Sequence, residues 1–241
     1  IAVTAGRLSI EFADRIHYPS LAGIVIEGEG FRKKINCGGP AVLDYEADWP
    51  ETPRHLQTLD FYRDWAENQF GKAVMEETAA IFSKMDGRLA IPVVWTNGPG
   101  GIVPNSRPWA EVLRDYSFVD ELAALEARVS GKGCQERFGY WLKSFAYMRE
   151  VAFFTCLWRE YNATMEKVNS ETDGASRAKL AEATALPLRV RMAASLKKIY
   201  DYLLATVSNT GEMGTIMNWE SHILPVAFDK PGEELAQAMG R

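Results

Sequence analysis

The stretch from Glu136 to Val168 reads ERFGYWLKSFAYMREVAFFTCLWREYNATMEKV, and it decides the fold class of the chain. It contains no proline, and its apolar residues recur at helical spacing in two neighbouring stripes. The first stripe comprises Phe138, Trp141, Leu142, Phe145, Met148 and Ala152, and the second comprises Tyr147, Val151, Phe154, Trp158 and Tyr161. A helix with apolar contacts around most of its circumference is buried, so we predict a central apolar helix that the other elements surround.

Helical spacing on both sides of this stretch predicts further helices. They cover residues 58–70, 74–85, 108–129, 176–204 and 231–239. Pro187 either kinks the fourth of these helices or starts a new segment. The glycine-marked segment Asn209–Pro225 is instead predicted to be a loop. The second part of the chain is therefore expected to be a mainly α-helical, bundle-like domain.

The beginning of the chain has the alternating pattern of β-strands. Apolar residues alternate with polar ones in Arg7–Phe12 and again in Leu21–Gly28. Two strands do not fold alone, so we expect the end of a β-sandwich or an edge hairpin. Residues 36–57 are rich in glycine and proline and read as a linker. The predicted organisation is a β remnant at 1–35, a linker at 36–57 and a helical domain at 58–241.

The composition excludes several classes of protein. With a net charge of −5, the chain lacks the basic surface that nucleic-acid binding or an anionic membrane requires. No apolar run approaches the roughly 18–20 residues of a membrane span. Since the sequence begins at Ile1 without a methionine, we interpret it as a piece of a longer polypeptide.

Cysteine and histidine usage gives little support for a metal site. Cys156 lies in the apolar helix and is expected to be a buried free thiol. Cys37 and Cys134 both lie in predicted loops and could pair, although nothing in the sequence requires it. No CxxC or HxxxH pattern is present, so we predict no metal site of His and Cys and no cofactor. Asp44, Glu46 and Asp48 in the linker are expected to be solvated, and the alternative is that they bind a cation.

The first candidate site is the loop that contains Trp95, Asn97 and Trp109, with three glycines between them. An aromatic face beside amide and backbone donors suits a sugar ring, which stacks its C–H face and hydrogen-bonds its hydroxyls. The competing interpretation is a rigid connecting loop whose tryptophans fill the core. The spacing is not GxGxxG and no Lys-Ser/Thr follows the glycines, so the loop does not match a phosphate-binding motif.

The second and third candidates supply carboxylates. Glu136 begins the central helix, where the helix dipole alone favours a carboxylate, but it also suits a ligand contact. The third cluster brings an amide, an indole, a carboxylate and an imidazole together in a segment expected to line a site; its residues are Asn218, Trp219, Glu220 and His222. His222 is equally suited to a structural role. Glu136 and Glu220 form an acid/base pair only if the fold brings them within about 5–10 Å.

Several phrases resemble known carbohydrate-active proteins. RLSIEFADRIHYPSLAGIVIEG (Arg7–Gly28) is similar to the closing strands of a malectin-like carbohydrate-binding β-sandwich, and KINCGGPAVLDYEAD (Lys34–Asp48) resembles the phrase around such domains. Four further segments together resemble the C-terminal portion of large, multi-domain bacterial glycoside hydrolases described as agarase-like. They are DFYRDWAENQFG, WTNGPGGI, ERFGYWLKSFAYMR and GEMGTIMNWESHILP. The layout is also similar to the C-terminal helical regions of α-glucuronidases.

The resemblance implies a secreted or periplasmic glycoside hydrolase acting on a plant or algal polysaccharide, of which this chain is one part. Such enzymes carry their acid and nucleophile on a (β/α)₈ barrel, of which at most one strand is present here. We expect Trp95 and Trp219 to stack on sugar, with Trp109 beside them, Asn97 and His222 to bind hydroxyls, and Glu136 or Glu220 to supply a carboxylate. The alternative is a non-catalytic carbohydrate-binding or structural helical module.

Overall fold

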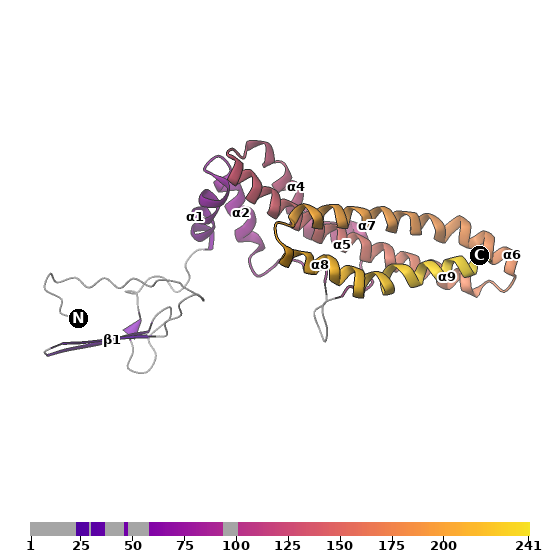
Figure 1. Cartoon of the computed structure of the whole chain (residues 1–241), viewed down its shortest axis with the longest axis horizontal. Helices are drawn as coiled ribbons and strands as arrows, with labels where there is room; N and C mark the ends of the chain where they lie inside the picture. The colour runs from indigo at the N-terminus through magenta and orange to yellow at the C-terminus, as the bar shows by residue number, and fades with distance from the viewer. Residues whose placement is uncertain (1–22, 29, 37–45, 48–57, 94–100) are drawn as a thin grey trace. The chain divides into compact units, whose positions relative to one another are not determined.

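The computed structural model of the chain describes residues 23–28, 30–36, 46–47, 58–93 and 101–241. The chain forms two compact units, Ile1–Leu56 and Gln57–Arg241. The described residues are mainly α-helical (Figure 1), which confirms the predicted mainly α class. The central apolar helix stays a prediction. The division into a β remnant, a linker and a helical domain stays a prediction, and the expected strand Arg7–Phe12 lies outside the described residues.

Within the first unit, the described residues form a small sheet in the order β1-β2-β3. Strand β1 (Gly23–Gly28) pairs antiparallel with β2 (Phe31–Asn36), and β3 (Glu46–Ala47) pairs parallel with β2. Opposed residues Glu27 and Arg32 form an ion pair of 2.8 Å that fits this register. The alternating pattern predicts β1 but not β2, and the residues of β3 fall in the predicted linker.

The first helices of the second unit follow the apolar pattern closely. Helices α1 (Thr58–Phe70) and α2 (Met75–Met85) have the expected bounds within one residue. The predicted helix over 108–129 is wrong as one element, because it divides into short pieces. These are α3 (Trp109–Val112), a 3₁₀ turn (Leu113–Tyr116), α4 (Phe118–Ala123) and a second 3₁₀ turn (Glu126–Arg128). The pieces still bury one apolar side toward α5.

Long helical stretches form the rest of this unit. Helix α5 covers Lys132–Ser170, α6 covers Gly174–Leu180, α7 covers Leu186–Thr206, α8 covers Met213–Asn218 and α9 covers Lys230–Ala238. A π-helical turn (Ala181–Ala185) joins α6 to α7, and Pro187 lies in the first turn of α7. Two further π-helical turns, Trp219–Ile223 and Pro225–Asp229, join α8 to α9. The predicted loop Asn209–Pro225 is therefore wrong, since it is helical from Thr210 onward.

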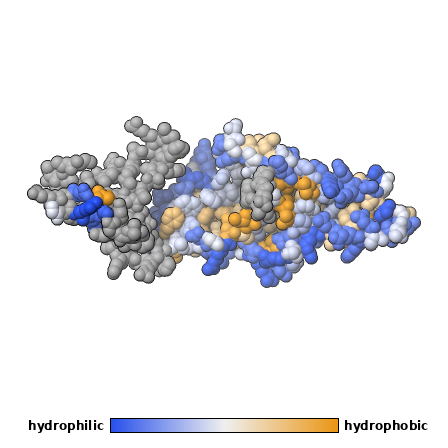
Figure 2. Space-filling model, turned by 90° about the horizontal axis from the view of Figure 1, so that it is seen from below, coloured by the Kyte–Doolittle hydropathy of each residue, from blue (hydrophilic) through white to orange (hydrophobic). Residues whose placement is uncertain are grey.

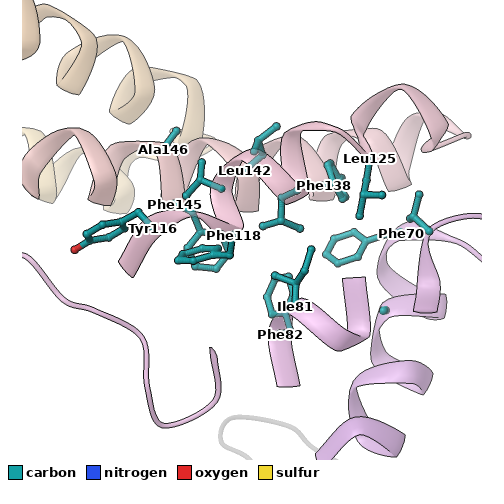
Figure 3. Packing of buried hydrophobic residues seen from close by; sticks show 14 of the residues in the cluster. Phe70, Ile81, Phe82, Tyr116, Phe118, Leu125, Phe138, Leu142, Phe145 and Ala146 are labelled. Carbon is teal, nitrogen blue, oxygen red and sulfur yellow. The ribbon is translucent and has the colours of Figure 1, made fainter. Parts of the chain in front are cut away.

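The two apolar stripes of α5 pack into two different hydrophobic clusters. Every member of the first stripe lies in or against a cluster with α1, α2 and α4, whose buried residues include Phe70, Phe82 and Leu122. Figure 3 shows part of this cluster, in which the rings of Phe70 and Phe138 lie 5.3 Å apart and those of Phe82 and Phe145 lie 5.7 Å apart. Every member of the second stripe lies in or against a cluster with α7, α8 and α9.

Helices α5, α7 and the α8–α9 stretch lie side by side, as Figure 1 shows. Helix α5 thus packs against the helices of residues 58–129 along one part of its length, and against α7 and the α8–α9 stretch along the other. Among the described residues we find no helix with the length and apolar character that crossing a membrane requires.

Candidate functional site

A capping box starts the helical stretch that carries the third candidate cluster. The side-chain oxygen of Asn209 accepts hydrogen bonds from the amides of Gly211 (2.9 Å) and Glu212 (3.3 Å). The carboxylate of Glu212 in turn accepts from the amide of Asn209 (3.3 Å) and from the Ser208 hydroxyl (2.9 Å). The Ser208 amide is the main group that lowers the pKa of Glu212, with help from the Ser208 hydroxyl. This reciprocal cap is what turns the glycine-marked segment into a helix.

The π-helical turns set which residues of this stretch face the core. Proline has no N–H to donate, so Pro225 interrupts the regular hydrogen bonding of the helix that runs from α8 into α9. Through the two turns, Trp219, Ile223 and Ala227 stay buried, and His222 is exposed. The turns therefore separate two residues that the sequence analysis placed in one site.

Trp219 is a core residue, and its predicted role of stacking on a sugar is wrong. Its side chain is 0% exposed, so it has no free face. Its ring packs edge-on against Phe154 of α5 at 6.3 Å, and its Nε1 donates a hydrogen bond of 3.0 Å to the hydroxyl of Tyr147. Burial raises the pKa of Tyr147, and the hydrogen bond from Trp219 partly offsets that rise.

A pocket lies between α5, α8 and the segment before residue 94, and we call it the α5–α8 pocket. Its volume is about 650 Å³. It is lined by Ile91, Pro92, Val93, Tyr147, Met148, Gly214, Thr215, Met217, Asn218, Ser221, His222 and Ile223. The lining is mostly apolar with a few polar side chains, the usual character of a site for a small ligand. Ile91 is 66% exposed and Met217 is 56% exposed, and Figure 2 shows hydrophobic residues in orange on the surface of the helical unit.

The pocket includes one predicted site residue, His222, together with residues that sequence reasoning missed. Tyr147 and Met148 appeared in the sequence only as core positions of α5, since their spacing fits a buried stripe. Met217 carries no chemical signal in the sequence at all. Nothing local shows that these positions meet His222, because 75 residues separate Tyr147 from it.

Glu220 does not face the α5–α8 pocket. It is not among the lining residues, and its Oε1 accepts a hydrogen bond of 2.6 Å from the hydroxyl of Tyr200 on α7. Burial is the main cause that raises the pKa of Tyr200, and the hydrogen bond to Glu220 adds to it. Glu220 thus holds α7 and the α8–α9 stretch together on the outside of the helices.

Glu136 lies on an exposed part of α5. Its carboxylate is 3.8 Å from the ammonium group of Lys132, one turn earlier on the same helix. Eleven residues of α5, or about 16 Å along the helix axis, separate Glu136 from Tyr147, which contacts Trp219. The carboxyl groups of an inverting glycosidase are about 6.5–9.5 Å apart and those of a retaining one about 5 Å. Glu136 and Glu220 each have a different partner, Lys132 and Tyr200, and their acid/base pairing stays a prediction.

The structure describes only one of the predicted site residues of the first candidate loop, Trp109. Trp95 and Asn97 lie outside the described residues, so their predicted roles stay predictions. Trp109 begins α3, is half-buried, and packs its ring 4.9 Å from that of Phe153. It is not among the residues that line the α5–α8 pocket, and its environment fits the alternative of a tryptophan that fills the core.

The described residues also bear on metal ions and thiols. Within the ranges that the structure describes, no group of three His, Cys, Asp or Glu side chains is placed to hold a metal ion. Cys156 is free and buried, as predicted, and burial raises the pKa of its thiol to about 11. Cys134 is also free, and Cys37 lies outside the described residues.

Comparison with known proteins assigns the chain to no family. No known protein family, curated protein or solved structure matches it.

Proposed function

We propose that this chain is part of a saccharide-processing glycoside hydrolase, and that its helical unit lines the saccharide site through the α5–α8 pocket. The sequence phrases quoted above support the saccharide context, with a plant or algal polysaccharide as substrate and a secreted or periplasmic location. In this proposal the acid and nucleophile come from the remainder of a larger chain, because Glu136 and Glu220 are each paired with another side chain, Lys132 and Tyr200.

The observation that carries the proposal is the make-up of the α5–α8 pocket. Apolar residues such as Met148 and Met217 form most of its wall, and the polar groups of Ser221 and His222 lie together on one helical turn. Apolar surface suits the C–H face of a sugar ring, while a few fixed polar groups select its hydroxyls. His222 is exposed, so its imidazole is accessible to a ligand.

The test is saccharide binding by the intact chain and its variants. Affinity electrophoresis against plant and algal polysaccharides measures binding, and release of reducing ends measures turnover. We expect binding with no turnover by this chain alone. His222→Ala should weaken binding roughly fivefold, which corresponds to one lost hydrogen bond of about 1 kcal/mol. Glu136→Gln, outside the pocket, serves as the matched control and should leave binding unchanged.

Two results would count against this proposal. Binding that is indifferent to His222→Ala would remove the α5–α8 pocket from the saccharide site. Turnover by the chain that Glu136→Gln abolishes would return the catalytic role to Glu136.

A second candidate function is a structural helical module that supports a catalytic domain. It is favoured by the inward packing of Trp109 and Trp219 and by the exposed apolar side chains of Ile91 and Met217. An exposed apolar patch of this kind promotes association. Sedimentation velocity of the isolated chain separates the two candidates, because the structural module should self-associate and Met217→Ser should reduce that association.

A further inference from the structure

A second groove lies beyond the site of the proposed function, between α5 and α9. It is lined by Trp158, Asn162, Met165, Glu166, Asn169, Val226, Lys230, Pro231 and Glu234 and has a volume of about 400 Å³. A neighbouring pocket of about 270 Å³ shares Asn169 and Glu234 with it and adds Arg177, Gln237 and Ala238. Because the two share residues, they form one continuous depression, which we call the α5–α9 groove.

The helical repeat of both helices explains why polar residues collect here. On α5, Asn162, Glu166 and Asn169 recur at spacings of four and three residues and therefore project from one face. On α9, Lys230 and Glu234 are one turn apart and project from one face in the same way. Two polar ridges thus border one groove.

The floor of the groove is apolar, in contrast to its border. Trp158 is 8% exposed and Met165 is 4% exposed, and Pro231 is buried beside them. Tyr161, on the neighbouring turn of α5, holds this floor in place, because its hydroxyl donates a hydrogen bond of 2.6 Å to the carbonyl of Pro231. An apolar floor on a fixed backbone, bordered by polar groups, is the pattern of a preformed ligand site.

The polar groups of the groove are not used by the fold. Five polar side chains border the α5–α9 groove, and they are Asn162, Glu166, Asn169, Lys230 and Glu234. Among the described residues, none of these five side chains forms a side-chain hydrogen bond or an ion pair. In the same part of the structure, the Nε of Arg177 is buried without a hydrogen-bond partner. A buried donor without a partner destabilises the fold, so a ligand that accepted a hydrogen bond from it would remove that cost.

The balance of groups in the groove selects the class of ligand. Two carboxylates face one ammonium and one guanidinium group, so the groove carries no net charge and has no preference for an anion or a cation. A wholly apolar ligand would desolvate the polar border without replacing its hydrogen bonds. A neutral polyol supplies hydroxyl groups that both donate and accept, and its C–H faces cover apolar surface.

We infer that the α5–α9 groove is a second binding site, specific for a neutral saccharide. The site is separate from the α5–α8 pocket, because Trp158 lies ten residues, or about 15 Å along the α5 axis, from Met148. Carboxylates and amides accept and donate to the sugar hydroxyls from both helices, and the buried floor provides the apolar contact.

The experiment uses the intact chain on an array of neutral cello-, xylo- and agaro-oligosaccharides, with polygalacturonate oligosaccharides as charged comparison. The tightest neutral binder is then titrated by calorimetry into wild type, Asn169→Ala/Glu234→Ala, Lys167→Ala and His222→Ala. Lys167 is exposed on the same helix outside the groove and is the matched control. Both groove residues are exposed, so their removal should not unfold the chain, which thermal unfolding checks.

We expect at least tenfold weaker binding of the neutral saccharide by the double variant and unchanged binding by Lys167→Ala. An array with no neutral binder, a preference for the charged oligosaccharides, or full affinity in the double variant overturns the inference. Weakening by the double variant alone supports the groove and counts against the α5–α8 pocket. Weakening by His222→Ala alone supports the α5–α8 pocket and counts against the groove. Failure of this inference can therefore be distinguished from failure of the proposed function.

Discussion

At the scale of single residues, burial decides the role of each aromatic side chain. Trp219 and Tyr161 both had the chemical groups of a binding residue, but each is almost wholly buried and uses its polar atom within the fold. Buried indole and phenol groups are normally hydrogen-bonded in this way, since an unpaired donor in the core is costly.

Replacement of Trp219 should therefore affect stability before it affects any ligand. We predict that Trp219→Ala lowers the free energy of unfolding by about 3–5 kcal/mol, because it leaves a cavity in the second cluster. Met217→Ala, two residues earlier and 56% exposed, is the control and should change it by less than about 0.5 kcal/mol. Urea denaturation followed by circular dichroism measures both, and equal effects would contradict the buried position of Trp219.

Tyr161 should make the fold sensitive to alkaline pH. Burial raises the pKa of its phenol from 10.0 to about 12. Because the folded pKa exceeds the unfolded one, its contribution to stability is complete below about pH 10 and is lost as the pH rises toward 12. We predict that the free energy of unfolding falls across that window.

The matched variant for this effect is Tyr161→Phe. It should lower stability at neutral pH through the lost bond to Pro231 and should show a shallower decline between about pH 10 and 12. Burial is also the main cause of the raised pKa values of Tyr116 and Tyr200. These two residues should therefore still lower the stability of the Tyr161→Phe variant at alkaline pH. A variant whose pH profile runs parallel to that of wild type would exclude Tyr161 as a source.

At the scale of elements, a helix cap and a buried apolar side can make a glycine-containing segment helical. The segment after Thr206 has the glycines of a loop, yet the capping box of Asn209 and Glu212 and the buried side of Ile216, Trp219 and Ile223 make it helical. Glycine inside a helix costs about 1 kcal/mol relative to alanine, which a cap and one buried face readily exceed.

Removal of the cap should loosen the start of this helix. We predict that Asn209→Ala lowers the free energy of unfolding by about 1 kcal/mol, because two amides lose their acceptor. Amide hydrogen exchange should accelerate over residues 210–216 and stay unchanged in α7. Thr210→Ala, an exposed neighbour outside the box, is the control, and equal acceleration in both variants would rule out the cap as the cause.

At the scale of the whole molecule, the helical unit contains both hydrophobic clusters. All of their members fall between residues 59 and 239, so the unit has its own core. A unit with its own core is expected to fold without the rest of the chain. We predict that residues 57–241 produced alone keep the helical circular dichroism signal and a single cooperative thermal transition. A broad, non-cooperative transition would show that the first unit is required for folding.

The sequence by itself determined the helical class, the bounds of α1 and α2 and the two faces of α5. These properties are local, because the spacing of apolar residues along one helix shows which side it buries whatever its partners are. The breaks at Leu113–Tyr116 and Glu126–Arg128 escaped prediction, since short 3₁₀ turns keep the same apolar side facing the core. Strand β2 escaped because its pairing partner, not its own pattern, makes it a strand.

Only the tertiary structure decided which residues meet. Trp219 bonds to Tyr147, 72 positions earlier in the chain, and Glu220 bonds to Tyr200. The fold brings His222 beside Tyr147 and Met148 in the α5–α8 pocket, and the packing of α9 on α5 assembles the α5–α9 groove. Such contacts depend on how several helices pack against one another at once, and no spacing within a single segment encodes that arrangement.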